Sequence, residues 1–237
     1  MRNSATKSLR YRLLLRSSLN LAHRYAAKIC AAASPIKYCM IRFIHIPKTA
    51  GTTVGKWLRR NDIDHIIGES LNRYSRHWPM HRCTTLLDAW SFAVVRSPFT
   101  RTCSYWRWMQ RLPNYRDISF EQFCREKTNW GRVRQAWIPQ TWWTHDSSNR
   151  IIVDAIIRME ELPHALWDLF GIRTKLGRLN TTSGPTDEEL HTKETLAIVR
   201  EHFAADLEQF GYDPNSGLII PGVKLVSRSY EESHNTV

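Results

Sequence analysis

The feature that most constrains this chain is an apolar run that leads through a short polar loop into a helix. Residues 40–46 form the run, which ends at Pro47 and has the length and composition of a buried strand. Residues 52–60 have the pattern of a helix whose basic residues lie toward its carboxyl end, where the helix dipole favours positive charge. We therefore expect a strand, a tight loop and a helix as the first unit of the fold.

A second unit of the same kind begins about fifty residues after the start of the first. Residues 90–95 are a strand candidate, and a turn then leads into a helix that we expect to end near Gln110. Ser97 is a suitable N-cap for this helix, and Pro98 suits its first position because proline lacks the N–H that would be unsatisfied there.

The carboxyl half of the chain continues the alternation. Residues 150–157 are a third strand candidate and residues 160–169 a helix. An amphipathic helix is expected over 186–203, with Thr186 and Glu189 as a capping box. Alternating strands and helices predict an α/β fold, here a P-loop-like three-layer domain with a central, mainly parallel sheet flanked by helices.

The loop of the first unit has the residue types of an anion-binding site. Backbone N–H groups at a strand–helix junction converge on an anion, and the helix dipole favours negative charge there. We expect the anion to be held by Lys48, Thr49, Ala50, Gly51, Thr52 and Thr53. Glycine permits close approach of the chain to the ligand. The lysine precedes the glycine, unlike in a Walker A loop, and this order disfavours a kinase or another NTPase.

The same loop, His-Ile-Pro-Lys-Thr-Ala-Gly-Thr-Thr at residues 45–53, resembles the 5′-phosphosulfate loop of the carbohydrate-type sulfotransferases. That family includes the heparan sulfate O-sulfotransferases and many bacterial relatives. Its second motif is an Arg and a later Ser that bind the 3′-phosphate of the donor, and Arg96 and Ser104 have the required separation. Ser97 and Thr100 depart from the family pattern, which has Asn or Asp and an acid at these positions. The departures change local hydrogen bonding and leave Arg101 in place.

Weaker resemblances follow in the order of the family, so that the likeness covers about residues 40–214. They lie at Pro139 and Gln140, at residues 153–162, at residues 179–183 around Asn180, and at residues 206–212. We accordingly divide the chain into a basic extension at 1–38, which is disordered or helical, a sulfotransferase domain at 39–214 and a tail at 215–237.

The resemblance implies a sulfotransferase that moves a sulfuryl group from 3′-phosphoadenosine-5′-phosphosulfate (PAPS) to a hydroxyl group by in-line transfer. Lys48 would stabilise the bridging oxygen, and no metal is expected. A histidine suits the role of general base. Family members often place one between the two motifs, where His77 is the favoured candidate, His81 the next and Glu69 a further option. His77, His81 and Cys83 also resemble zinc ligands, but Pro79 would break a helix that joined them.

Charge and cysteine content narrow the partners and the compartment. Residues 1–39 hold eight of the 34 Lys and Arg residues and no acid, so the net charge of +12 falls to +4 for the rest. Nucleic acid is therefore not an expected partner, although the basic extension could contact a membrane surface weakly. Five cysteines without a CxxC pair, and no apolar stretch long enough for a signal peptide or membrane span, predict a cytoplasmic protein.

The acceptor is expected to be a glycan or another hydroxyl compound, bound by the Trp- and Arg-rich loops between residues 111 and 149. Two other functions stay open at this point. One is a different P-loop-like nucleotide-dependent transferase such as a kinase. The other is a non-catalytic anion-binding protein that uses its basic amino-terminal arm.

Overall fold

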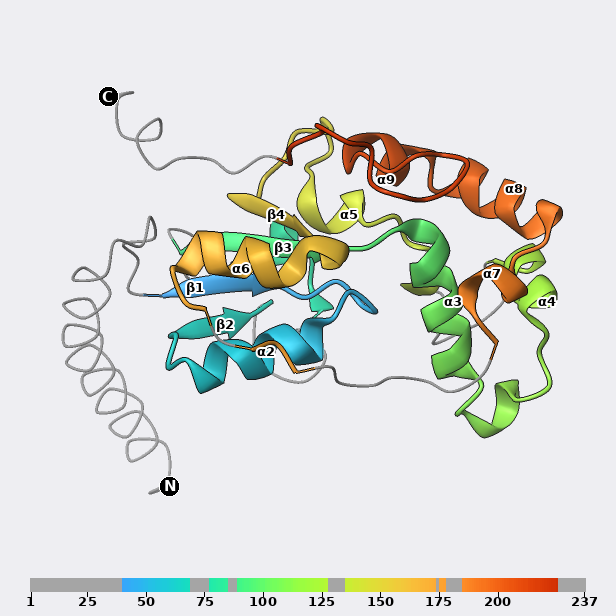
Figure 1. Cartoon of the computed structure of the whole chain (residues 1–237), viewed down its shortest axis with the longest axis horizontal. Coiled ribbons are helices and arrows are strands. Elements are labelled where there is room, and N and C mark those ends of the chain that lie inside the picture. The colour runs from blue at the N-terminus through green and yellow to red at the C-terminus, as the bar shows by residue number, and fades with distance from the viewer. Residues whose placement is uncertain are drawn as a thin grey trace, which may run out of the picture.

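The computed structural model describes residues 40–68, 77–84, 89–127, 135–173, 175–177 and 185–225. The basic extension at 1–38, Glu69 and the loop at 179–183 around Asn180 lie outside these ranges. Figure 1 shows a sheet with helices on both of its sides. Of the helices that the structure describes, none has both the length and the apolar character needed to cross a membrane.

The described residues form four strands in the order β2-β1-β3-β4, and every neighbouring pair is parallel. The strands are β1 (Ile41–Ile44), β2 (His65–Ile67), β3 (Trp90–Val95) and β4 (Ala155–Arg158). The predicted α/β three-layer class is confirmed, whereas β2 was not predicted because its three residues carry too short a pattern. The strand predicted at 150–157 is shorter than expected. Its first half turns toward the preceding segment, where Ile151 pairs antiparallel with His145.

The helices surround this sheet in two groups. They are α2 (Gly51–Arg60), α3 (Pro98–Met109), α4 (Phe120–Arg125), α5 (Thr141–Thr144), α6 (Leu162–Phe170), α7 (Asp187–Leu190), α8 (Lys193–His202) and α9 (Ala204–Gln209). Short 3-10 helices lie at η2 (Met80–Arg82), η3 (Pro113–Tyr115) and η5 (Met159–Glu161). In Figure 1, α2 and α6 lie on one side of the sheet, and α3, α4, α7 and α8 gather together beyond one end of the strands.

Alternating side chains of the strands build a separate core on each face of the sheet, as the two-residue period of a strand requires. The core under α2 and α6 contains Phe43, Phe92, Val94 and Ile157, together with Val54 and Leu166 of the helices. The core on the opposite face contains Ile44, Ala93, Val95 and Ile156, together with Phe99, Phe123 and Val199. Because both faces are covered, the strands read as nearly continuous apolar runs in the sequence.

The helix predicted over 186–203 is two helices, α7 and α8, that meet near His191. The capping box of Thr186 and Glu189 is confirmed. A second capping box, formed by Thr192 and Thr195, starts α8. The His191 ring lies between them and contacts the carbonyl oxygen of Phe99 and the sulfur of Cys103. The amphipathic pattern runs through both helices and therefore conceals the break.

Residues after 214 pack against the domain as far as the structure describes them. Tyr212 pairs with Ile219, and Gly217 adopts a φ of +69° beside the ring of Phe99. A Cβ atom at Gly217 would lie 2.4 Å from that ring and 2.7 Å from the hydroxyl of Ser97. Glycine is therefore required where this segment crosses the turn between β3 and α3.

Candidate functional site

The two predicted anion-binding turns lie side by side because the strands that precede them are parallel neighbours. Ile44 of β1 pairs with Ala93 of β3, so both chains leave the sheet at its carboxyl edge. Open parallel sheets bind their ligands at this edge. Arg96 follows β3, and its Nη1 lies 3.5 Å from the carbonyl oxygen of Lys48 in the loop after β1.

The loop after β1 has a demanding backbone. Lys48 and Ala50 have φ angles of 69° and 63°, in the left-handed region that residues with a Cβ atom seldom enter. Such positions cost on the order of 1–3 kcal/mol each and concentrate at ligand sites. Thr49 between them is fully buried, and its hydroxyl donates to the carbonyl oxygen of Ile46 at 2.9 Å. The Thr49 side chain therefore holds the loop in shape from within.

The start of α2 is free of competing groups. Ala50 occupies the N-cap and has no side chain that can accept from the first-turn N–H groups, and no acid lies in the first turn. A helix start of this kind is prepared to bind an anion. Thr52 is exposed and Thr53 half-buried, so both hydroxyls border the solvent side of the helix.

Gly51 is also required by the packing of the loop itself. A Cβ atom at this position would lie 1.8 Å from the imidazole of His45. That ring stacks in turn on Phe43, with 5.7 Å between ring centroids.

Lys48 lies in a strongly positive environment. Burial, together with the positive charges of Arg96 and Arg111, lowers its pKa to about 8. Arg111 lies just past the end of α3 and is exposed. No motif singled it out, because its proximity to Lys48 depends on how α3 packs against the loop. Three cations that repel one another in this way form a site that a multiply charged anion would stabilise.

Arg96 is fixed through both its backbone and its side chain. The side-chain amide of Gln140 accepts from the Arg96 N–H at 2.9 Å and donates to its carbonyl oxygen at 2.8 Å. The Arg96 Nε donates to the hydroxyl of Thr100 at 2.8 Å. Thr100 thus supplies a neutral acceptor where the family pattern has an acid, which leaves the positive charge of Arg96 uncompensated at this contact. Ser104 lies one turn further along α3 and is half-buried.

Gln140 is held by a buried carboxylate. Asp206 of α9 accepts from the backbone N–H groups of Gln140 and Thr141, at 2.7 and 3.0 Å, and from the Gln140 amide at 3.2 Å. Burial raises the pKa of Asp206, and these hydrogen bonds oppose the increase. Two of the weaker resemblances in the sequence therefore meet in space, and together they position Arg96.

Arg101 anchors the loop after β1 from behind. It is fully buried and donates to the carbonyl oxygens of Pro47, Ile138 and Gln135 at 3.1–3.3 Å. Its guanidinium lies 5.8 Å from the centre of the Trp143 ring. Burial lowers the pKa of Arg101, and the carbonyl and aromatic contacts compensate the charge. Arg101 therefore connects the loop to the segment that carries Gln140.

His77 lies directly against the loop. Its ring centre is 4.4 Å from that of His45, and its Nδ1 lies 3.0 Å from the His45 carbonyl oxygen. A carbonyl can only accept, so Nδ1 carries the proton and the lone pair of the neutral ring is on Nε2. Trp143 donates from its Nε1 to the His77 carbonyl oxygen at 2.9 Å. Contacts at both its ring and its backbone hold His77 in this orientation.

His81 lies elsewhere. It is exposed on η2 and meets the edge of the Trp142 ring at 5.3 Å, and burial and the charge of Arg82 lower its pKa. Cys83 donates its thiol to the Pro79 carbonyl oxygen. Within the described part of the chain, no group of three or more His, Cys, Asp or Glu side chains could hold a metal ion.

The predicted start of α3 is confirmed, with Ser97 at the N-cap and Pro98 in the first turn. Ser97 occupies the N-cap of α3, but its hydroxyl makes no capping bond there, and the Ser97 N–H instead donates to Glu160 at 3.1 Å. Arg158 pairs with Glu161 at 3.1 Å, while Glu160 also accepts from the hydroxyl of Tyr212 at 2.9 Å. The 3-10 turn of η5 directs the two neighbouring carboxylates toward different partners.

Comparison with known proteins agrees with this geometry at the level of the family. Neither the curated proteins nor the solved structures provide a match to the chain. The model of the sulfotransferase family matches residues 37–213, which include both predicted anion-binding turns, Gln140 and Asp206. A match over well more than half of the sequence is sufficient for assignment, and the chain belongs to the sulfotransferase family.

Proposed function

We propose that the chain transfers a sulfuryl group from PAPS to a hydroxyl group of a carbohydrate acceptor. The observation that carries this proposal is the convergence of Arg96 and Arg111 on Lys48, where burial and these two charges lower the pKa of Lys48 to about 8. PAPS has a phosphosulfate at its 5′ position and a phosphate at its 3′ position. Two anion sites on neighbouring strand ends suit a donor that is charged at both ends.

Each predicted donor residue has a proposed role. The first-turn amides of Gly51, Thr52 and Thr53 bind the 5′-phosphate together with the two threonine hydroxyls. Arg96 and Ser104 bind the 3′-phosphate. Thr49 and Ala50 act through the shape of the loop, since Thr49 is fully buried and the Ala50 backbone is left-handed.

The proposed transfer requires little covalent participation by the protein. His77 Nε2 takes the proton of the acceptor hydroxyl, whose oxygen forms a bond to sulfur as the bond from sulfur to the 5′-phosphate oxygen breaks. Lys48 stabilises the negative charge that develops on this leaving oxygen. The products are the sulfate ester and adenosine 3′,5′-bisphosphate. As in phosphoryl transfer, positioning and electrostatic stabilisation supply most of the rate.

A glycan acceptor is supported by side chains of the segment after α3 and of α5. Arg111, whose charge acts on Lys48, and Arg116 are exposed, and Trp142 is half-buried. Cations and a flat aromatic ring are groups that bind acidic or sulfated sugars. A screen of glycans with labelled PAPS would identify the acceptor.

The donor proposal is tested by calorimetry with adenosine 3′,5′-bisphosphate and by transfer of label from PAPS. Lys48→Ala and Arg96→Ala should each weaken binding or turnover by about 100-fold or more. Lys193→Ala removes an exposed lysine of α8 and should change neither. Unchanged binding and turnover in both site variants would refute the donor assignment.

Two assays separate the other functions. Transfer of label from ATP but not from PAPS would favour a kinase, which the order of lysine and glycine opposes. Removal of residues 1–38 should leave binding of adenosine 3′,5′-bisphosphate intact if the domain is an enzyme. A binding protein that depends on its basic arm would lose its ligand.

A further inference from the structure

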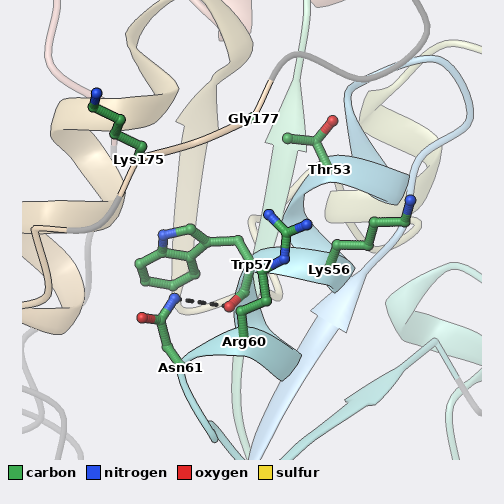
Figure 2. Close-up of a pocket in the computed structure, with 7 residues that line it drawn as sticks. All are labelled: Thr53, Lys56, Trp57, Arg60, Asn61, Lys175 and Gly177. Atoms are coloured by element: carbon green, nitrogen blue, oxygen red, sulfur yellow. Dashed lines mark hydrogen bonds between the residues drawn. The ribbon is translucent and has the colours of Figure 1, made fainter.

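A second concentration of positive charge lies along α2, beyond its first turn. Figure 2 shows a hollow between this helix and the segment that follows α6. Thr53, Lys56, Trp57 and Arg60 line it from the helix, and Lys175 lines it from the other side. Thr53 also belongs to the phosphate loop, so the hollow lies next to the proposed donor site.

The three charged side chains of the hollow are all cations. Lys56 and Arg60 are four residues apart on the same face of α2, where like charges repel and weaken a helix. Among the described residues, neither forms an ion pair, and no carboxylate lines the hollow. Placement of Arg60 at the carboxyl end of α2 is favourable for the helix dipole. That effect does not account for Lys175, which approaches from another segment.

Trp57 supplies an observation that is independent of charge. Its side chain is 3% exposed, and its ring meets the edge of Phe170 at 5.4 Å between centroids. Its Nε1–H is buried without an acceptor in the part of the chain that the structure describes. In Figure 2 the nitrogen is on the edge of the indole nearest Lys175. A buried donor without an acceptor is unfavourable, and an oxygen atom of a ligand would remove this deficit.

The hollow is large enough for a small anion. Its volume is about 120 Å³, and a cavity needs on the order of 10–15 Å³ of this kind to hold one water molecule. A tetrahedral group with four oxygen atoms fits this volume. The Arg60 guanidinium and the Trp57 indole N–H are donors that suit such a group, and Lys56 and Lys175 add positive charge at the two sides of the hollow.

We propose that this hollow is a second oxyanion site that binds a sulfate or phosphate group and is separate from the donor cradle at Lys48 and Arg96. The group is either a free inorganic anion or an ester of a larger molecule. A sulfate ester on the acceptor is the second source, and that part of the inference rests on the proposed function.

The indole N–H of Trp57 allows a local test on the full chain by NMR with nitrogen-15-labelled tryptophan. Sodium sulfate is titrated against sodium chloride of equal ionic strength, with and without saturating adenosine 3′,5′-bisphosphate. Trp57→Phe identifies the resonance. We expect sulfate to move it, with or without the nucleotide. An unchanged Trp57 chemical shift would overturn the proposal, because the hollow would then not bind sulfate. A shift change that the nucleotide abolishes would also overturn it, because the hollow would then be part of the donor site.

Two variants of α2 provide the matched comparison. Arg60→Gln removes a charge that lines the hollow, while Arg59→Gln removes the same charge from the neighbouring residue, which does not line it. We expect Arg60→Gln to weaken sulfate binding about tenfold in calorimetry, and Arg59→Gln to leave it unchanged. Equal effects would refute a built site and indicate general charge attraction.

Separate measurements identify the source of the bound group and test the donor proposal. Competition by a sulfated oligosaccharide that depends on Arg60 would assign the site to an ester, and its absence would assign the site to a free anion. If the donor proposal is wrong, Lys48→Ala will leave the affinity for the nucleotide unchanged. The response of the Trp57 resonance to sulfate would still be observed in that case.

Discussion

Donor binding at alkaline pH should be accompanied by uptake of a proton, because the pKa of the Lys48 amine in the free protein lies below its ordinary value. The free protein has a Lys48 pKa of about 8, so Lys48 is charged in about 90% of molecules at pH 7 and about 10% at pH 9. The negative charge of the donor favours the charged amine and raises this pKa. The bound state thus holds more protons than the free state above pH 8, and the affinity must fall as the pH rises.

The size of the effect follows from the two charged fractions. Binding of adenosine 3′,5′-bisphosphate should take up about 0.9 proton at pH 9 and about 0.1 at pH 7, and its affinity should fall about tenfold between them. Calorimetry in buffers with different ionisation enthalpies measures the uptake. Lys48→Gln should abolish it. Arg111→Gln removes a like charge, so the pKa of Lys48 rises and the uptake at pH 9 decreases. Uptake that is absent from the natural sequence, or that persists in Lys48→Gln, would refute the reasoning.

Three further predictions concern the base and the supports of the site. His77→Ala should lower turnover by about 10²- to 10⁴-fold while the nucleotide dissociation constant stays within about twofold; equal losses in both would assign His77 to donor binding. Asp206→Asn should destabilise the fold by about 1.5–3 kcal/mol in urea unfolding. The N–H groups of Gln140 and Thr141 bind the two carboxylate oxygens of Asp206, and an amide has only one oxygen. A loss below about 0.5 kcal/mol would contradict this. Gly51→Ala should lower the free energy of unfolding by about 1–3 kcal/mol, because its Cβ would meet His45 at 1.8 Å. Gly55→Ala, with its nearest contact at 3.1 Å, should lower it less. Thermal unfolding compares the two variants, and equal losses of stability would refute the explanation.

Much of the fold could be predicted because its signals are local. The run before Pro47 and the turn at Pro98 each mark a boundary within a few residues, and the observed β3 has the predicted bounds. The break between α7 and α8 was missed because the amphipathic pattern is continuous across it, while the hydrogen bonds of His191 that accompany the break involve residues far away in the sequence. Boundaries set by distant partners leave no mark in a local pattern.

The candidate site divides in the same way. Lys48, Arg96 and Ser104 could be identified as anion-binding candidates from residue type and spacing, and the order of lysine and glycine disfavoured a kinase. Arg111 could not, because its effect on Lys48 requires the packed orientation of α3. The pairing of Arg158 with Glu161 could not be predicted either, since a single 3-10 turn decides which of two adjacent acids faces Arg158.

The sequence by itself determined the strand–loop–helix unit at 40–60, its repetition near residue 96, and the chemical character of both turns. Spacing along one strand or helix is enough for such inferences. Only the tertiary structure decided that His77 rests on the loop while His81 does not, that His45 is the reason for Gly51, and that Gln140 and Asp206 hold Arg96. The order of the parallel strands and the packing of α9 bring these residues together. Their separation along the chain does not reveal how close they lie in space.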